Sequence, residues 1–324
     1  FGGIMSSQVS AVPGTDLQII PIIVNGQKVK FPDTEPYINT DGRTMVPVRF
    51  VSEKLGAEVE WEADTQTAIL HFEGKTIQMP IGSKTVSVDG EVQELDTAAE
   101  FTDGRTMVPL RFVSEVLGSN VEWDNDAHSV RVTDAAYQAK VDAGEVTLDP
   151  WGREYSKNYD ESWIRLKDLE STGFYDFRGT SNSRSFIEKR KLRYKETADV
   201  ASAKIRAWYS AQLNIDYRSI DEKAFIDAFL DNASGRISMN SYLRSENELY
   251  MKEYIKWVKE NKVIAKGYAD PEMSTALGAG VVFYVPTRFK FMIISATDTS
   301  RTFMDNWDVS GMSDSFELKK GVWY

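Results

Sequence analysis

A stretch of 21 residues occurs twice in this chain, as Asp41–Trp61 and again 62 residues later as Asp103–Trp123. Both copies begin with Asp-Gly-Arg-Thr-Met-Val-Pro and continue, at the same offset, with Arg-Phe-Val-Ser-Glu. A match of this length lies far beyond chance, so the chain contains a duplicated structural unit. We therefore expect the two copies to adopt the same fold.

Each copy is predicted to contain a hairpin, a short helix and further strands. The dipeptides Asn25-Gly26 and Asp89-Gly90 interrupt apolar runs, and both favour a two-residue hairpin turn because their residues tolerate positive φ. Helices are predicted at Pro47–Leu55 and Pro109–Leu117, each with an apolar face and a glycine stop after it. Helices this short do not persist alone in water, so we expect the copies to share strands or a common core.

The second half of the chain shows helical patterns first and strand patterns later. Helices are predicted over residues 197–213, from a capping box at Ser219–Glu222, and over Glu246–Asn261. β-Branched and aromatic runs then predict strands at 280–285, 288–294, 315–318 and 322–324.

The predicted fold class is therefore α+β. We expect tandem antiparallel-sheet-plus-short-helix repeats, followed by an α+β domain of several helices and a late antiparallel sheet. The predicted divisions are a flexible start or residual signal at residues 1–16, the repeats at 17–133, and a C-terminal domain of unknown function at 134–324.

The repeated motif, with its Asn/Asp-Gly hairpin and a Val-Glu-Trp after each helix, resembles the copper amine oxidase N-terminal-like domain, often called a stalk domain. The resemblance covers residues 20–133 and implies a module of the kind found in exported proteins of Gram-positive bacteria. A copper amine oxidase itself needs three histidine ligands and a tyrosine-derived quinone. This chain has two histidines, which do not occupy equivalent repeat positions, so neither a metal nor a cofactor is expected.

The composition excludes several further classes of site and partner. The chain has no cysteine, which rules out disulfides, thiolate metal sites and cysteine nucleophiles. Residues 1–132 carry 20 acidic and 10 basic side chains, whereas residues 133–324 carry 29 and 28. Because nucleic-acid binding needs clustered cations, no nucleic-acid partner is expected. No stretch reaches the roughly 18 apolar residues that span a bilayer.

The start of the chain resembles the tail of a secretory signal, with a small-residue pattern at Val9-Ser-Ala11. The alternative interpretation is a flexible chain end. Together with the resemblance to exported modules, this pattern predicts a secreted or cell-surface protein.

Several side chains of the repeats have both a structural and a functional interpretation. Trp61 and Trp123 are predicted to lie in the core, with sugar stacking as the alternative. Arg49 precedes Glu53 by four residues, and Arg111 precedes Glu115 by the same spacing. This spacing favours an ion pair within each helix. A loose calcium site at residues 124–126 is the alternative to a solvated acidic face.

Aromatic and acidic side chains alternate after residue 148, which is the composition of a sugar cleft and also of an aromatic-rich loop. The candidate carbohydrate contacts are Trp151, Tyr155, Tyr159 and Trp163. Their acidic neighbours are Asp149, Glu154, Asp160 and Glu161, and a glycosidase needs two such carboxylates. No motif for a serine, cysteine, metal-dependent or phosphate-loop enzyme occurs.

A basic strip at residues 184–195 holds six cations and one acid: Arg184, Lys189, Arg190, Lys191, Arg193 and Lys195, with Glu188. A solvated helix face is the simplest interpretation. The alternative is a contact for an anionic wall polymer, or for the acidic repeat half of a neighbouring molecule, which would build a filament or array.

The sequence thus predicts a non-enzymatic structural or binding protein of the cell surface. A carbohydrate-active enzyme that uses the repeats for targeting is the alternative.

Overall fold

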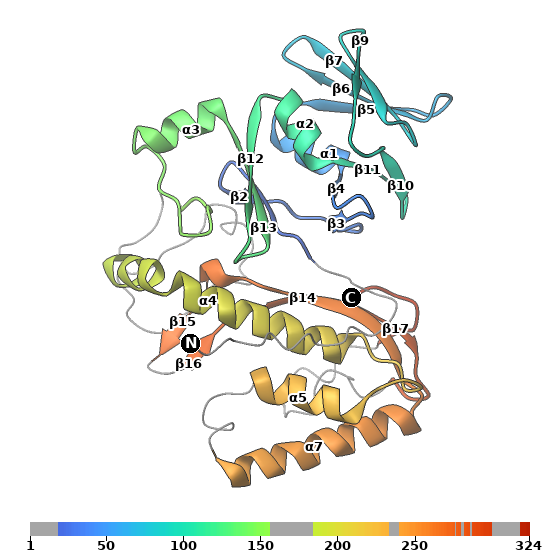
Figure 1. The fold of residues 1–324 in the computed structure, drawn as a ribbon, viewed down its shortest axis with the longest axis vertical. Helices are drawn as coiled ribbons and strands as arrows, with labels where there is room; N and C mark the ends of the chain where they lie inside the picture. Colours follow the sequence, from blue (N-terminus) through green and yellow to red (C-terminus); the bar gives the residue numbers. More distant parts are fainter. Residues whose placement is uncertain are drawn as a thin grey trace, which may run out of the picture. The chain divides into compact units, whose positions relative to one another are not determined.

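The computed structural model describes residues 19–155, 184–232, 240–275, 277–279, 282–285, 287–299 and 318–324 (Figure 1). These residues form a mixed α+β structure, which confirms the predicted fold class. They fall into two compact units, residues 19–196 and 197–324, here called the repeat unit and the C-terminal unit. This boundary lies further along the chain than the predicted one after Thr133.

Both copies of the repeat contain the same order of strands and one short helix, as expected. The first copy contributes β1 (Ile22–Val24), β2 (Gln27–Lys28), β3 (Tyr37–Ile38), β4 (Thr44–Pro47), α1 (Val48–Lys54), β5 (Glu58–Glu62), β6 (Thr67–Phe72) and the connecting strand β7 (Lys75–Pro80). The second contributes β8 (Thr85–Val88), β9 (Glu91–Glu94), β10 (Glu100–Thr102), β11 (Arg105–Pro109), α2 (Leu110–Val116), β12 (Ser119–Asp124) and β13 (Ser129–Asp134), and α3 (Ala135–Asp142) follows.

The two prolines of the motif end strands instead of opening helices. Pro47 and Pro109 have ψ values of 116°, which is extended backbone, and α1 and α2 begin one residue later. The predicted helix starts were therefore one residue early, because the fixed φ of proline suits a strand end as well as a first helical turn. Gly56 and Gly118 stop the helices with positive φ, as predicted.

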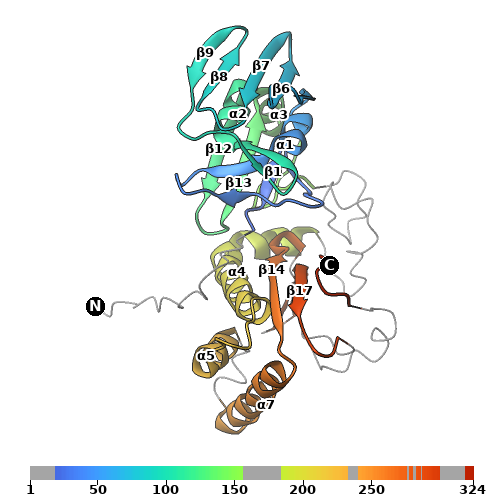
Figure 2. The ribbon, with the colours of Figure 1, turned by 90° about the vertical axis from the view of Figure 1, so that its right-hand side faces the viewer.

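The hairpin of each copy lies in the sheet of the other copy. Hairpin β1–β2 joins the second copy's strands in a sheet of order β12-β13-β1-β2, with β1 parallel to β13. Hairpin β8–β9 joins the first copy's strands in the order β5-β6-β7-β8-β9. Figure 2 shows these two sheets in the repeat unit. Neither copy is therefore a complete folding unit.

The copies meet at β4 and β11 around a pseudo-twofold axis. These strands pair antiparallel so that Val46 lies opposite Val108, its own repeat equivalent. They are the centre of a sheet of order β10-β11-β4-β3. Side chains link its two edge strands, since the Tyr37 hydroxyl on β3 donates to Glu100 Oε2 on β10 at 2.6 Å. One continuous apolar core, from Ile20 to Val132, runs through both copies, as predicted.

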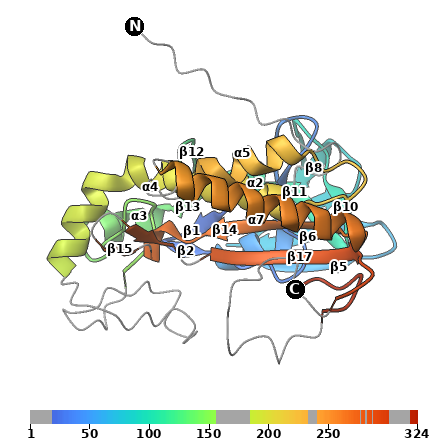
Figure 3. The ribbon, with the colours of Figure 1, turned by 90° about the horizontal axis from the view of Figure 1, so that it is seen from below.

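The C-terminal unit packs helices on one face of a two-stranded sheet. Its elements are the main part of α4 (Arg184–Leu213), then α5 (Glu222–Asn232), α7 (Ser241–Glu260), β14 (Ile264–Pro271), the 3₁₀ turn η3 (Met273–Thr275), β15 (Leu277–Ala279), β16 (Val282–Tyr284) and β17 (Thr287–Ser295). Figure 3 shows α4, α5 and α7 on the same side of the β14–β17 pair. Their shared core includes Trp208, Ile255 and Ile293.

Three predictions for this unit were inaccurate. Strand β14, the antiparallel partner of β17, was missed, and the predicted strand at 280–285 pairs with β15 instead. Helix α7 begins five residues earlier than predicted because Asn240 caps it. The cap of α5 is Asp221, whose Oδ1 accepts from the Ala224 backbone N–H at 2.7 Å, and not Ser219.

Candidate binding site between the two copies

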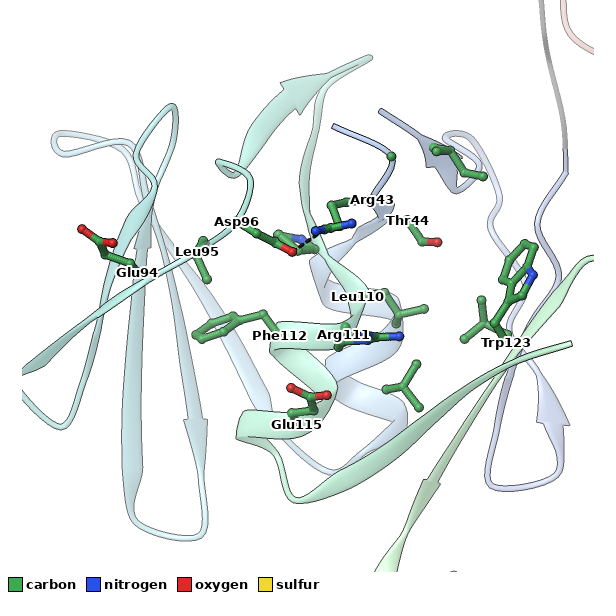
Figure 4. Close-up of a pocket in the computed structure, with 15 residues that line it drawn as sticks. Arg43, Thr44, Glu94, Leu95, Asp96, Leu110, Arg111, Phe112, Glu115 and Trp123 are labelled. Atoms are coloured by element: carbon green, nitrogen blue, oxygen red, sulfur yellow. Dashed lines mark hydrogen bonds and ion pairs between the residues drawn. The ribbon is translucent and has the colours of Figure 1, made fainter. Parts of the chain in front are cut away.

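A cavity of about 510 Å³ opens where the two copies meet, and we call it the inter-copy cavity (Figure 4). Its apolar wall includes Ile38 from the first copy and Leu95, Leu110, Val121, Trp123 and Val130 from the second. Its charged lining residues are Arg43, Glu94, Asp96, Arg111 and Glu115. Such a mixture of a largely apolar wall with a few polar groups is typical of a ligand site.

The charged groups of the cavity belong to two sets. Arg43 Nε donates to Asp96 Oδ2, so these two charges neutralise one another across the two copies. Arg111 and Glu115 lie on α2, and Figure 4 shows Arg111 on the side of α2 that faces Trp123. The cavity therefore offers both hydrogen-bond donors and carboxylate acceptors.

Trp123 is held in one orientation at the cavity. Its indole Nε1–H donates to Asn125 Oδ1 at 2.7 Å, and its ring is tilted against His128 with centroids 6.3 Å apart. The side chain remains 38% exposed. Because the polar edge of the ring is already bonded, the aromatic surface is the part that is left to a ligand.

The equivalent Trp61 has a different environment. It is 43% exposed and stacks on Phe101, with centroids 6.3 Å apart and an interplanar angle of 30°. Residue 63 is alanine, so the side-chain acceptor that Asn125 supplies to Trp123 is missing. The prediction that both tryptophans lie in the core was therefore wrong. Each tryptophan lies two residues after a valine that packs against the core, Val59 or Val121, and therefore on the same face of its strand, but the core leaves it partly exposed.

Strand register identifies the residue that corresponds to Phe101. Phe101 lies opposite Thr106 on β11, and Ile38 lies opposite the repeat-equivalent Thr44 on β4. Ile38 therefore takes the place beside Trp123 that Phe101 takes beside Trp61. An aliphatic side chain cannot stack as a ring does, and the cavity lies on this side of the pseudo-twofold axis.

Comparison with known families agrees with this repeat architecture. Residues 23–132 match the family model described as the copper amine oxidase N-terminal domain. This part of the chain is thus similar to the copper amine oxidase N-terminal domain. No family model matches the C-terminal half.

One similar protein is described as "Protease inhibitor" and comes from Brevibacillus choshinensis. It is 27% identical over 153 residues, which are 45% of this chain and 46% of that protein. The chain thus spans less than half the length of this relative.

The predicted calcium alternative at residues 124–126 is not supported. Asp124 Oδ1 accepts from the backbone N–H groups of Asp126 and Ala127, and Asn125 holds Trp123. Burial alone would raise the pKa of Asp124, but the bonds from Ala127 and Lys195 outweigh it, so the pKa is lowered. Among the residues described, no group of three or more histidine, aspartate or glutamate side chains could hold a metal ion.

The predicted helix ion pair occurs in the first copy of the repeat. Arg49 Nη1 lies 3.4 Å from Glu53 Oε1 on α1. In the part of the chain described, no such pair joins Arg111 and Glu115, and both side chains line the cavity instead.

The candidate carbohydrate contacts do not form an exposed platform where they are described. Trp151 and Tyr155 are buried, at 7% and 6% exposure. Tyr159 and Trp163, with Asp160 and Glu161, lie outside the described residues. Asp149 Oδ1 accepts from backbone N–H groups of its own turn, and Glu154 accepts from the Tyr137 hydroxyl at 2.9 Å.

The basic strip forms the first turns of α4. The side chains of Arg184, Lys189, Arg190, Lys191 and Arg193 lie outside the described part of the structure. Lys195 is described, and its Nζ lies 3.1 Å from Asp124 Oδ2 in the repeat unit. None of the described helices is long and apolar enough to cross a membrane.

The inter-copy cavity was not predicted from the sequence. One part of its signal was present as a difference between the copies, Asn125 against Ala63. The other part was not, because the repeat offset of 62 aligns Phe101 with Asn39, and only the strand register shows that Ile38 is its counterpart.

Proposed function

We propose that this is a non-enzymatic binding or structural protein of the cell exterior, in which the duplicated domain is a rigid scaffold that holds a ligand or partner. The observation that carries the proposal is the inter-copy cavity with its oriented, exposed Trp123. Two of the carboxylates considered for a glycosidase, Asp149 and Glu154, are described. Asp149 caps a turn and Glu154 accepts from the Tyr137 hydroxyl, which favours binding over acid–base chemistry.

The location outside the cell is supported by the family of the repeat and by the sequence pattern at Val9-Ser-Ala11. The chain without cysteine depends on packing for its stability, and the shared core of the two copies supplies such packing.

Cell-wall attachment can be tested by co-sedimentation of the purified chain with isolated Gram-positive cell walls. We expect the chain to pellet with the walls. A chain that stays in the supernatant with intact walls and is also a strict monomer in solution would contradict the proposal.

An anionic wall polymer is the partner that the basic strip favours. Replacement of Lys189, Arg190, Lys191 and Arg193 by serine should then weaken wall retention, and more so at low salt because screening is weaker there. Walls stripped of phosphodiester-linked polymers are the matched control. Equal retention of variant and wild type on intact walls at low salt would remove the strip from the proposal.

The proposed structural role includes self-association, in which copies of this chain bind to one another. The pair between Lys195 and Asp124 joins the basic strip to an acidic copy within one molecule, and a neighbouring molecule offers the same chemistry. Static light scattering at two salt concentrations should give a larger mass at the lower one. A monomer at both would leave wall binding as the function.

Protease inhibition is a second candidate, because the similar protein from Brevibacillus choshinensis is described as a protease inhibitor. The measurement is the residual activity of subtilisin-type and trypsin-type proteases after incubation with the chain. Stoichiometric loss of protease activity would favour this candidate, whereas degradation of the chain without inhibition would exclude it for these proteases.

A further inference from the structure

The inter-copy cavity has features that narrow the chemistry of its ligand. It lies wholly within the repeat unit, and it combines two aromatic side chains, Trp123 and Phe112, with an aliphatic wall and charged residues of both signs. We propose that the cavity binds a neutral sugar ring of a glycan, stacked on Trp123 and hydrogen-bonded by Arg111. This inference rests on the proposed binding function and names its ligand class.

The first argument is the preparation of the aromatic surface. The bond from Trp123 Nε1 to Asn125 restrains the ring before any ligand arrives, which lowers the entropy that binding must overcome. The bonded edge also leaves the indole without a free donor. A ligand must therefore use the face of the ring, and the C–H face of a pyranose is flat, apolar and of matching size.

The second argument is the charge of the rim. Arg43 and Asp96 neutralise one another, so the other charged lining residues are Arg111, Glu94 and Glu115, which are of both signs. Figure 4 shows Arg111 on the side of Trp123, and Glu94 on the opposite side of the cavity. A cationic group stacked on Trp123 would meet Arg111 and be repelled, whereas a sugar hydroxyl can accept from the guanidinium without a charge of its own.

The third argument is the difference between the copies. Phe101 stacks on one face of Trp61, while Ile38 at the equivalent strand position leaves Trp123 with the cavity beside it. Trp61 as a whole is no less exposed than Trp123, at 43% against 38%, so the copies differ in the cavity and in the ring face that Phe101 occupies.

Isothermal titration calorimetry of the full chain tests the proposal with N-acetylglucosamine tetramer, cellotetraose and mannotetraose as neutral probes. We expect at least one of them to bind with a stoichiometry of one. The variant Trp123→Ala should weaken binding about tenfold or more, because it removes the stacking surface. The matched control Trp61→Ala should leave the affinity unchanged.

The variant Ile38→Phe provides the sharper test. A phenyl ring at this position should stack on Trp123 as Phe101 stacks on Trp61, and binding should be lost. Phe101→Ile, the reverse change, should retain the original affinity. Since Ile38 is 49% exposed, the change does not disturb the core.

Three results would overturn the ligand class. These are no heat of binding for all three neutral probes at millimolar concentration, binding that survives both Trp123→Ala and Ile38→Phe, or binding of oligogalacturonate or trilysine in place of the neutral probes. The proposed function would survive any of them if the chain still pellets with cell walls. It would fail separately if reducing ends appeared on incubation with a bound probe, because the chain would then be an enzyme.

Discussion

At the scale of single residues, Gly26 shows how a turn residue of the repeat became specialised in one copy. Its φ is +73°, and a Cβ built on it would lie 2.1 Å from the Tyr137 hydroxyl and 2.8 Å from Glu154 Cβ. Its carbonyl oxygen also accepts from the Glu154 backbone N–H at 2.7 Å. The glycine thus lets the chain after α3 lie directly on the first hairpin.

The variants Gly26→Ala and Gly90→Ala separate two reasons for a glycine in a turn, namely its positive φ and the close approach of neighbouring atoms. Gly90 has φ +86° but nothing within 4 Å of a built Cβ, so its replacement should cost about 1 kcal/mol from backbone conformation alone. Gly26→Ala carries the same cost plus a clash, and we expect a loss larger by about 1–3 kcal/mol. Urea unfolding measures both, and equal losses would contradict the close approach.

Tyr37 links the two edge strands of the central sheet through its bond to Glu100 and should make the stability depend on alkaline pH. Burial, and then the bond to Glu100, raise the pKa of Tyr37 from 10.0 to about 12. Because the folded pKa lies above the unfolded one, this contribution is complete below about pH 10 and is lost as the pH rises toward about 12.

The variant Tyr37→Phe should therefore cost about 1 kcal/mol at neutral pH, from the lost hydrogen bond. The difference from the wild type should shrink between about pH 10 and pH 12. Urea unfolding at neutral pH and in this range gives the comparison. A difference that stays constant would show that the tyrosine does not titrate with folding.

At the scale of elements, the start of α5 depends on one side chain. Asp221→Ala should destabilise the C-terminal unit by about 1 kcal/mol, because it removes the acceptor for the Ala224 N–H. Ser219→Ala, the control, should be nearly neutral, since Ser219 lies two residues before the observed cap. Thermal unfolding measures both, and the reverse order would restore the capping box predicted from the sequence.

Local elements were predictable where a few residues determine the backbone. The Asn25-Gly26 and Asp89-Gly90 turns and the glycine stops at Gly56 and Gly118 all appear with positive φ. Strand β14 was not predictable in this way, because it contains lysine, glycine, aspartate and proline, which are rare in strands. Its Gly267 lies so close to β17 that a Cβ would be 2.7 Å from the Lys290 carbonyl oxygen.

Partners in space were harder to predict than elements. The sequence indicated that the copies share a core, but no local pattern told which sheet each hairpin would join. The cavity could not be predicted for the same reason. Trp123 and Ile38 lie far apart in the chain and line one cavity only because β4 pairs with β11. The exposed faces of Trp61 and Trp123 were missed because the alternating pattern puts each tryptophan on the core face, beside Val59 or Val121, but does not tell how far the core extends along the strand.

At the scale of the whole molecule, the exchange of hairpins predicts that the two copies unfold together. Met45 and Met107 are fully buried repeat equivalents on the paired strands β4 and β11. Met45→Ala and Met107→Ala should each cost about 2–5 kcal/mol, and each should destabilise both outer sheets. Hydrogen exchange of β5–β6 and β12–β13 reads the two sheets separately. Loss of protection in one sheet alone, with the other unchanged, would contradict the shared core.

The parallel pairing of β1 with β13 also has a consequence for synthesis. Asn25 and Asp134, which bond to one another at the end of this pair, are separated by 109 residues. A chain that emerges from the ribosome or translocates through a membrane N-terminus first must keep the isoleucine-rich first hairpin without its sheet until the second copy is nearly complete. Folding of this domain is thus a late, slow event with high contact order, and the nascent hairpin is the segment for which a chaperone has the longest access.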